Sequence, residues 1–378
     1  MTEAVAPAGP PVEVARCPIS PEVLPLNMRK HVDPGSPVPV RMMAAKALIP
    51  LAPSEMLGAL FILSFDSDAS IREMAAKTAG GLPDRILAPA LRDESTKAPV
   101  LAHFLNLVGD NEAYAQMVIL NATTPDEAVA KVASKCGSKI AEIVAQNQLR
   151  VLRHEDIIRQ LCRNPSASKA MIDGVCDFAV RSGVVLDDVQ QIQDARLRVF
   201  GPDALKKPVD RGPTAAEIMS EYLELADETA PPMEEGKRLT LSQRVMKMSI
   251  TEKIKLATVG NREARSLLIR DNNKLVAVAV IRSPRITDGE VLRVAANRAS
   301  PDEVLRIIYG NREWTKMYPV KLALVKNPKT PLAISLRFLA GLRESEVKEL
   351  GRDRNVPSSI QQAARKMTDK KDAPKRDS

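Results

Sequence analysis

The stretch Asn327-Pro328-Lys329-Thr330-Pro331 decides the fold of this chain. An apolar segment precedes it and a helical pattern follows it, and the same arrangement occurs earlier at Arg163-Asn164-Pro165-Ser166-Ala167-Ser168. Asn and Pro are frequent where a helix ends, and Ser or Thr before Pro is frequent where one starts. The sequence therefore predicts a repeated device that ends one short helix and starts the next.

The two halves of the chain resemble each other over long segments. An offset of 162 places Asp126 on Asp288, and an offset of 163 places Asn164 on Asn327. Within the second half, turn residues recur every 13 to 16 positions, which suits one short helix and a turn. Self-similarity of this kind is typical of repeat architectures.

Several hydroxyl residues stand where helices are expected to begin. Three of them come directly before a proline, and the fourth has an acidic residue three positions later. A Ser or Thr oxygen can accept a hydrogen bond from a first-turn N–H, and proline at the first helical position has no donor to lose. We therefore expect each hydroxyl to cap the helix that follows it. These candidate N-caps are Thr124, Ser249, Ser300 and Thr330.

The apolar segments between these signals are short. Val291–Ala295 and Val304–Ile308 would suit a buried strand as well as a helix, but the flanking caps, the many alanines and the spacing of Lys and Arg favour helices. Helices of this length are unstable alone and need neighbours. The sequence thus predicts an all-α chain, an α-solenoid of short stacked helices in two arrays. An irregular helical bundle is the alternative.

Composition shifts divide the chain into five predicted parts. Prolines and small residues predict a flexible arm at the start, and a Pro- and Gly-rich segment predicts a linker between the arrays. Within the linker, residues 215–226 have helical spacing and predict one amphipathic helix, which either packs on the end of an array or docks a partner. The parts are an arm at 1–38, the first array at 39–200, the linker at 201–238, the second array at 239–367 and a disordered charged tail at 368–378.

The overall composition limits the classes of protein. The 378 residues are 44% hydrophobic but only 3% aromatic, so the core must be aliphatic. No run of 18 apolar residues and no signal-peptide pattern occurs, which predicts a cytoplasmic protein with no membrane partner. The cysteines lack a C-x-x-C pair and a nearby histidine, so we expect ordinary thiols in a reducing compartment and no metal site. They are Cys17, Cys136, Cys162 and Cys176.

Charge separates the two halves of the chain. Residues 237–378 contain 31 Lys and Arg against 15 Asp and Glu, whereas residues 1–236 contain 24 against 32. The basic arginines are spread over several successive units of the second half. A face of this kind would attract a polyanion or an acidic protein surface, and binding to nucleic acid would weaken as salt rises.

The candidate binding face consists of basic residues in the second array. Two aromatic residues lie close to it in sequence, Trp314 and Tyr318, either as ligand contacts or as packing residues, and packing is the preferred reading because few aromatics are available for base stacking. The basic residues are Arg262, Arg265, Arg270, Arg282, Arg285, Arg293, Arg298, Arg312 and Lys316.

The Asn-Pro-x-Thr-Pro units resemble bacterial HEAT-like and leucine-rich-repeat-variant helical repeats. The stretch from Ile254 to Ala364, especially Asn311–Trp314 and Ala323–Leu332, is similar to a family of uncharacterised bacterial repeat proteins. The resemblance implies an α-solenoid used for binding and carries no catalytic residues. Leucine-rich-repeat-variant units would also imply a regular alternation of α and 3-10 helices.

The sequence gives little support for an enzyme. None of the histidines, His31, His103 and His154, is in a recognisable nucleophile setting. No glycine-rich phosphate-binding motif occurs either, so we predict no catalytic residue and no cofactor. Because some HEAT-like solenoids act on DNA bases, a lesion-processing enzyme stays an alternative.

Two functional hypotheses follow from the repeats and the charge. The first is a cytoplasmic, non-enzymatic scaffold or adaptor that binds proteins along a helical-repeat surface. The alternative is a nucleic-acid-binding protein that uses the basic second array. A third arrangement, in which the acidic first array covers the basic one, would make the charge asymmetry internal. The identity of the protein partner is not predicted.

Overall fold

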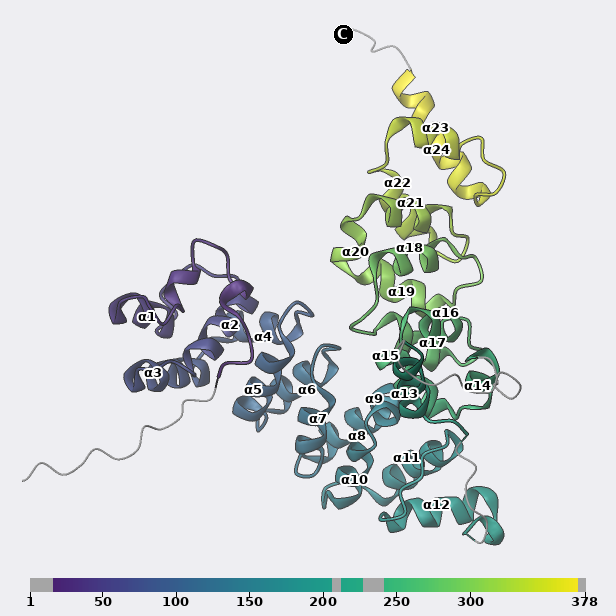
Figure 1. The fold of residues 1–378 in the computed structure, drawn as a ribbon. Coiled ribbons are helices and arrows are strands. Elements are labelled where there is room, and N and C mark those ends of the chain that lie inside the picture. Colours follow the sequence, from purple (N-terminus) through teal and green to yellow (C-terminus); the bar gives the residue numbers. More distant parts are fainter. Residues whose placement is uncertain (1–15, 206–211, 227–240, 373–378) are drawn as a thin grey trace, which may run out of the picture. The chain divides into compact units, whose positions relative to one another are not determined.

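The computed structural model describes residues 16–205, 212–226 and 241–372 (Figure 1). Within these ranges all regular elements are helices, 24 α-helices and three short 3-10 helices, and no strand occurs. The all-α prediction is confirmed. The chain divides into two compact units, the first made of Met1–Asp177 and Asp187–Ala195 and the second of Phe178–Leu186 and Arg196–Ser378.

The first unit contains two 3-10 helices and most of the first twelve α-helices, of which α11 and α12 extend into the second unit. Most of these helices have two or three turns. Their bounds are η1 Pro21–Val23, η2 Arg29–His31, α1 Val38–Ala45, α2 Pro53–Leu63, α3 Ala69–Gly80, α4 Asp84–Arg92, α5 Ala98–Val108, α6 Glu112–Leu120, α7 Asp126–Ala133, α8 Ser138–Gln146, α9 Gln148–Arg153, α10 Asp156–Arg163, α11 Lys169–Arg181 and α12 Gln190–Phe200.

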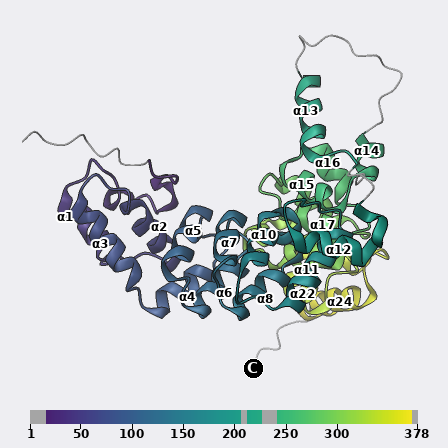
Figure 2. The same ribbon diagram turned by 90° about the horizontal axis from the view of Figure 1, so that it is seen from below.

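Helices of the first unit pack in two rows (Figure 2). One row contains α4, α6 and α8, and the other contains α5, α7 and α10, each helix in contact with the next of its row. Consecutive helices such as α5 and α6, or α7 and α8, connect the rows. The largest fully buried side chains come mainly from Leu and Ile, with Phe104 as the one aromatic ring among them. The core is therefore aliphatic, as the composition predicts.

The second unit contains the remaining helices. Their bounds are η3 Pro202–Leu205, α13 Ala215–Ala226, α14 Leu241–Lys247, α15 Ile250–Val259, α16 Arg262–Leu268, α17 Lys274–Ile281, α18 Asp288–Ala296, α19 Asp302–Gly310, α20 Arg312–Lys316, α21 Tyr318–Lys326, α22 Leu332–Leu339, α23 Glu344–Leu350 and α24 Ser358–Asp372.

Packing in the second unit follows the same pattern. Helix α15 contacts α17, which contacts α19, α18 contacts α21, and α22 contacts α24. Consecutive helices such as α18 and α19, or α21 and α22, contact each other as well. One continuous aliphatic cluster extends through the unit from Ala277 to Ala364, with Leu305, Leu324 and Leu339 fully buried. The predicted linker helix appears as α13, which contacts α15 and has Ile218 fully buried.

The predicted arm, linker and tail lie partly outside the described residues. Residues 1–15 of the arm, 206–211 and 227–238 of the linker and 373–378 of the tail fall there. The described part of the arm differs from a flexible segment, because η1 contacts α2, η2 contacts α1, and Leu24 and Val32 are buried. Helix α24 also continues to Asp372, into the residues predicted as tail.

Three asparagines join the ends of helices that are distant in sequence. Asn121, Asn164 and Asn327 each follow the last residue of a helix and are 2 to 4% exposed. The side-chain amide of Asn327 donates to the carbonyls of Ala295 and Asn297, at 2.8 and 3.1 Å, where α18 ends. Its Oδ1 accepts from the backbone N–H two positions later.

The other two asparagines repeat this geometry. Asn121 donates to the carbonyls of Leu91 and Asp93 at the end of α4, and Asn164 donates to those of Ala133 and Cys136 at the end of α7. The last carbonyls of a helix have no partner within that helix. Each asparagine therefore satisfies one orphan carbonyl of the neighbouring helix, that of Leu91, Ala133 or Ala295, and binds a second carbonyl just past the end of that helix.

Three of the four expected N-caps are wrong. Ser249 does accept from the N–H of Glu252 and caps α15. The N-caps of α7, α19 and α22, however, are the prolines that follow Thr124, Ser300 and Thr330. The Thr124 and Ser300 hydroxyls instead donate backward, to carbonyls six residues earlier in the preceding helix. The carbonyls of Val118 and Val294 lie within reach of these buried hydroxyls and accept from them in addition to the backbone N–H of Asn121 and Asn297, whereas proline presents no N–H to the hydroxyls.

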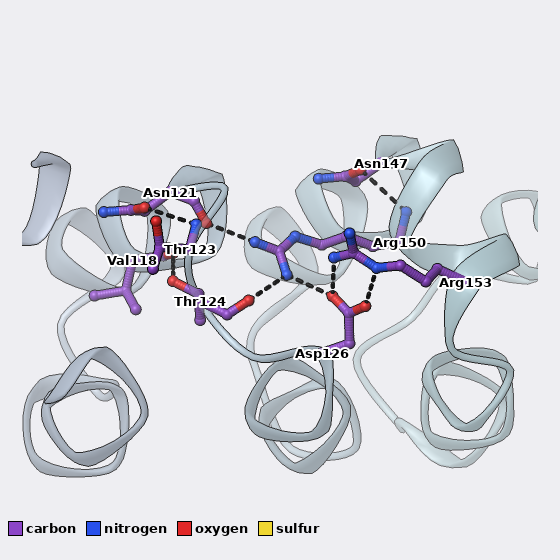
Figure 3. Close-up of polar contacts among 8 residues, drawn as sticks. All are labelled: Val118, Asn121, Thr123, Thr124, Asp126, Asn147, Arg150 and Arg153. Carbon is purple, nitrogen blue, oxygen red and sulfur yellow. Dashed lines mark hydrogen bonds and ion pairs between the residues drawn. The ribbon is translucent and has the colours of Figure 1, made fainter. Parts of the chain in front are cut away.

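Buried ion pairs form a second kind of connection (Figure 3). Arg150 and Arg153 on α9 both bind the carboxylate of Asp126 at the start of α7. Arg150 also donates to the carbonyls of Asn121 and Thr124. The Asp126 and Arg150 side chains are at most 9% exposed, so each depends on the other for charge compensation. Arg41 with Asp66, and Arg265 with Glu290, form similar buried pairs.

Arg150 and Arg153 stabilise the ionised form of Asp126. Burial by itself would raise the pKa of this carboxyl, but the hydrogen bonds and charges of Arg153 and Arg150 outweigh burial and keep the pKa below its ordinary value. The carboxylate therefore stays ionised at neutral pH, and the connection between α7 and α9 depends on that charge.

Replacing Asn327 by alanine should destabilise the second unit. The variant leaves the carbonyl of Ala295 without a donor and removes one of the two donors to the carbonyl of Asn297, which keeps the N–H of Ser300, a loss of about 1–3 kcal/mol. The midpoint of urea-induced unfolding should move to a lower concentration. Asn297→Ala is the matched control, because among the described residues the exposed Asn297 side chain bonds only the N–H of Ala299. Equal shifts for the two variants would contradict this role of Asn327.

Acid should weaken the Asp126 connection. Because the folded pKa of Asp126 is depressed, its contribution to stability is complete above the unfolded pKa of about 3.9 and is lost as pH falls through the folded pKa. The free energy of unfolding should therefore decline below about pH 4. Asp126→Asn should lower stability at neutral pH by about 3 kcal/mol and flatten the decline in acid. Denaturant titrations at a series of pH values would measure both effects, and an unchanged acid slope in the variant would contradict the assignment.

Candidate functional site

A cavity of about 590 Å³ in the second unit is lined by several of the predicted basic residues. Its wall is formed by α16 and the loop that follows it, by α18, and by the turn before α19, with Val280 of α17 between them. Ile269, Val280, Ile286 and Val294 give it an apolar surface. We call this cavity the arginine groove, because Arg265, Arg270 and Arg293 all line it.

The base of the groove is a buried ion pair. Arg265 of α16 donates Nε and Nη2 to the two oxygens of Glu290 on α18, at 3.0 and 2.9 Å. Its Nη1 donates to the carbonyl of Gly260 at 2.9 Å. A bidentate contact of this geometry fixes both side chains. The pair therefore holds the ends of α16 and α18 in register under the groove.

Glu290 has a second role at the start of α18. Its carboxylate accepts from the backbone N–H and the hydroxyl of Thr287, at 2.9 and 2.8 Å, and so completes a capping box. Burial would raise the pKa of Glu290, but the hydrogen bonds from Arg265 and Thr287 outweigh it and the pKa lies below its ordinary value. The ionised Glu290 carboxylate thus has a structural role, since Arg265 and Thr287 occupy both of its oxygens.

The rim of the groove carries positive charge. Arg270 and Arg293 are exposed, and within the described residues neither makes an ion pair. Asp271, which also lines the groove, is bound by Lys253 at 2.8 Å. Two arginines therefore face solvent beside an apolar surface, an arrangement that suits a ligand with both carboxylates and apolar groups.

The remaining predicted basic residues are distributed differently. The sequence places Arg265 on the candidate binding face, but the structure buries it, with 5% of it exposed, and pairs it with Glu290. Arg285 donates to the carbonyl of Val259 at 2.7 Å, Arg298 to the carbonyl of Asn355, and Lys316 pairs with Glu313. Outside the groove the structure also exposes Arg262, Arg282, Arg285, Arg298, Arg312 and Lys316.

The two candidate aromatic residues contact the protein itself. Trp314 is partly buried and packs against the aliphatic cluster of the second unit. The hydroxyl of Tyr318 donates to Glu346 and accepts from the N–H of Arg343 at 2.9 Å, and the Arg343 guanidinium lies 4.9 Å from the Tyr318 ring centre. Both side chains therefore help to pack α20 and α21 against their neighbours.

Sequence reasoning missed the acidic partner and the apolar part of the groove. Glu290 stands 25 residues after Arg265, the same separation as between Arg41 and Asp66. That repeated spacing was a usable signal for a buried pair. Ile269 and Ile286 carried no such signal, because an apolar residue in a turn can be buried or exposed.

Other classes of site find no support among the described residues. No group of three or more His, Cys, Asp or Glu in them could hold a metal ion. None of the described helices combines the length and the apolar character needed to cross a membrane. Comparison of the sequence with protein-family models, with curated proteins and with solved structures finds no match.

Removing the Glu290 side chain should destabilise the second unit. Glu290→Ala leaves the buried Arg265 without its counter-charge and removes the α18 capping box, and we expect a loss of about 3–5 kcal/mol. The urea midpoint measures this loss. Glu303→Ala is the control, because Glu303 pairs with the exposed Lys274 and should change the midpoint little. If both variants unfold at the wild-type midpoint, the Arg265–Glu290 pair does not support the groove.

Proposed function

We propose that each unit is an α-solenoid of short stacked helices, of the HEAT-like kind. Two features support this architecture. Helices of one row contact the next helix of the same row, and the asparagine connections recur between such neighbours, at Asn121, Asn164 and Asn327. A solenoid presents a long surface built from equivalent positions of successive repeats, which suits it to binding extended partners.

We further propose that the chain is a non-enzymatic scaffold or adaptor, which binds an acidic segment of a partner protein in the arginine groove. The observation that carries this proposal is the pairing of unneutralised Arg270 and Arg293 with an apolar surface in one cavity. The arginines would bind carboxylates bidentately, and Ile269 and Ile286 would contact apolar side chains of the same segment. On this proposal the protein acts in the cytoplasm and uses no cofactor.

An acidic peptide suits the groove better than a nucleic acid does. A phosphate backbone is usually bound by a row of cations, and bases stack on aromatic rings. Here four aliphatic residues accompany the arginines, and Trp314 and Tyr318 are engaged in packing. Nucleic acid stays the second candidate because of the net positive charge of residues 237–378.

Selection from a library of random displayed peptides tests the proposal on the full chain. We expect enriched peptides to combine Asp or Glu with Leu, Ile or Val. Each groove arginine should contribute roughly tenfold to the affinity, so the double variant Arg270→Ala/Arg293→Ala should bind such a peptide about a hundredfold more weakly. Fluorescence anisotropy with the labelled peptide measures the change.

A matched control uses arginines outside the groove. The double variant Arg282→Ala/Arg312→Ala removes the same charge from exposed positions and should leave peptide affinity nearly unchanged. Enrichment of neutral or basic peptides, or equal losses for the two double variants, would contradict the groove as the site. Tighter binding of labelled single- or double-stranded oligonucleotides than of any peptide at physiological salt would favour the nucleic-acid candidate instead.

A further inference from the structure

Two cysteines of the first unit lie in contact. Cys162 on α10 and Cys176 on α11 have their sulfur atoms 3.9 Å apart, within hydrogen-bonding distance for thiols. Both are free thiols, as are Cys17 and Cys136. The sequence predicts that all four are ordinary thiols, because Cys162 and Cys176 stand 14 positions apart and no motif marks their contact.

The two members of the pair differ in access. Cys162 is partly exposed, whereas Cys176 is fully buried. A small molecule from solvent can therefore reach Cys162, and the product of that reaction would meet Cys176 before any other thiol. This is the arrangement of an attacking and a resolving cysteine.

The contact also favours the reactive form of Cys162. The hydrogen bond from Cys176 lowers the pKa of the Cys162 thiol and outweighs burial, which raises it. Burial has the opposite net effect elsewhere, since it raises the pKa of both Cys136 and Cys17. The thiolate is the nucleophile of cysteine chemistry, so Cys162 should react ahead of the other accessible thiol, Cys17.

We propose that Cys162 and Cys176 form a reversible disulfide in response to hydrogen peroxide or organic hydroperoxides. The proposal assigns to this chain a modification site on the first unit. It is independent of the arginine groove, which belongs to the second unit.

The chemistry proceeds in two balanced steps. The Cys162 thiolate attacks one peroxide oxygen and the O–O bond breaks. The products are a sulfenic acid and either hydroxide, from hydrogen peroxide, or an alkoxide, from an organic hydroperoxide, and the released anion takes up a proton to give water or an alcohol. The Cys176 thiol then attacks the sulfenic sulfur, an S–S bond forms, and the sulfenic oxygen leaves as water. The two thiols together lose two electrons and the peroxide gains them. A dithiol reductant reverses the change.

Little rearrangement is needed for bond formation. A disulfide has an S–S length of about 2.05 Å, so the two sulfurs, now 3.9 Å apart, must approach by roughly 2 Å. The bond would close a loop that contains Asn164 and its connection to Ala133 and Cys136. Closing this loop restricts the unfolded chain, so the oxidised protein should be more stable than the reduced one.

The test is peroxide treatment of the folded full-length chain, followed by rapid alkylation, non-reducing digestion and mass spectrometry. We expect a peptide pair joined by Cys162 and Cys176, loss of alkylation at both residues, and recovery of alkylation after dithiothreitol. Cys17 and Cys136 should stay alkylatable on denaturation. Thermal unfolding of the oxidised wild type should occur at a higher temperature than that of the reduced form.

Two variants separate the roles of the pair. In Cys176→Ser the sulfenic acid of Cys162 has no resolving partner, so it should be trapped by dimedone, whereas Cys162→Ser should give neither the disulfide nor a dimedone adduct at position 176. Cys17→Ala is the control and should form the disulfide as the wild type does. The proposal is overturned if peroxide leaves both residues alkylatable in the folded wild type, or if Cys17 is oxidised first. A disulfide that joins either residue to Cys17 or Cys136 would overturn it equally.

Discussion

The structure depends on how the ends of many short helices satisfy their carbonyl groups. Every α-helix leaves its last carbonyls without intrahelical partners, and a chain of helices with two or three turns meets this requirement again and again. Leaving these buried carbonyls without hydrogen-bond donors would cost more free energy than the formation of such short helices contributes. Asn121, Asn164 and Asn327 supply donors to the neighbouring helix, and Thr124 and Ser300 supply them to the preceding one.

The same side chains also fix the spacing between helices. An asparagine that binds its own turn through Oδ1 and a neighbouring helix through its amide places two elements at a set distance. The aliphatic core alone would allow sliding, because Leu, Ile and Val contacts have little directionality. Buried ion pairs such as Arg150 with Asp126 add a further directional constraint between neighbouring helices.

The arginine groove depends on one of these buried ion pairs. Glu290 neutralises Arg265, and this pair, with the capping box of Thr287, connects α16, whose following loop carries Arg270, to α18, which carries Arg293. The same cavity is thus lined by a buried arginine, Arg265, that is neutralised within the protein, and by two exposed arginines, Arg270 and Arg293. The thiol pair of Cys162 and Cys176 likewise arises where two successive helices pack, at a place where local sequence shows no motif.

The sequence by itself determined the helical class, the aliphatic core, the cap at Ser249 and the separation of charge, because these depend on composition and on residues within one turn of each other. The repeated Asn-Pro device also marked where helices end. Only the tertiary structure decided which carbonyls the asparagines bind, that Thr124 and Ser300 point backward, that Arg265 is buried, and that two cysteines meet. Those outcomes require partners 14 to 32 residues away, or the burial of the site. Neither distance nor burial is encoded in the identity of a single residue, since both are set when neighbouring helices pack together.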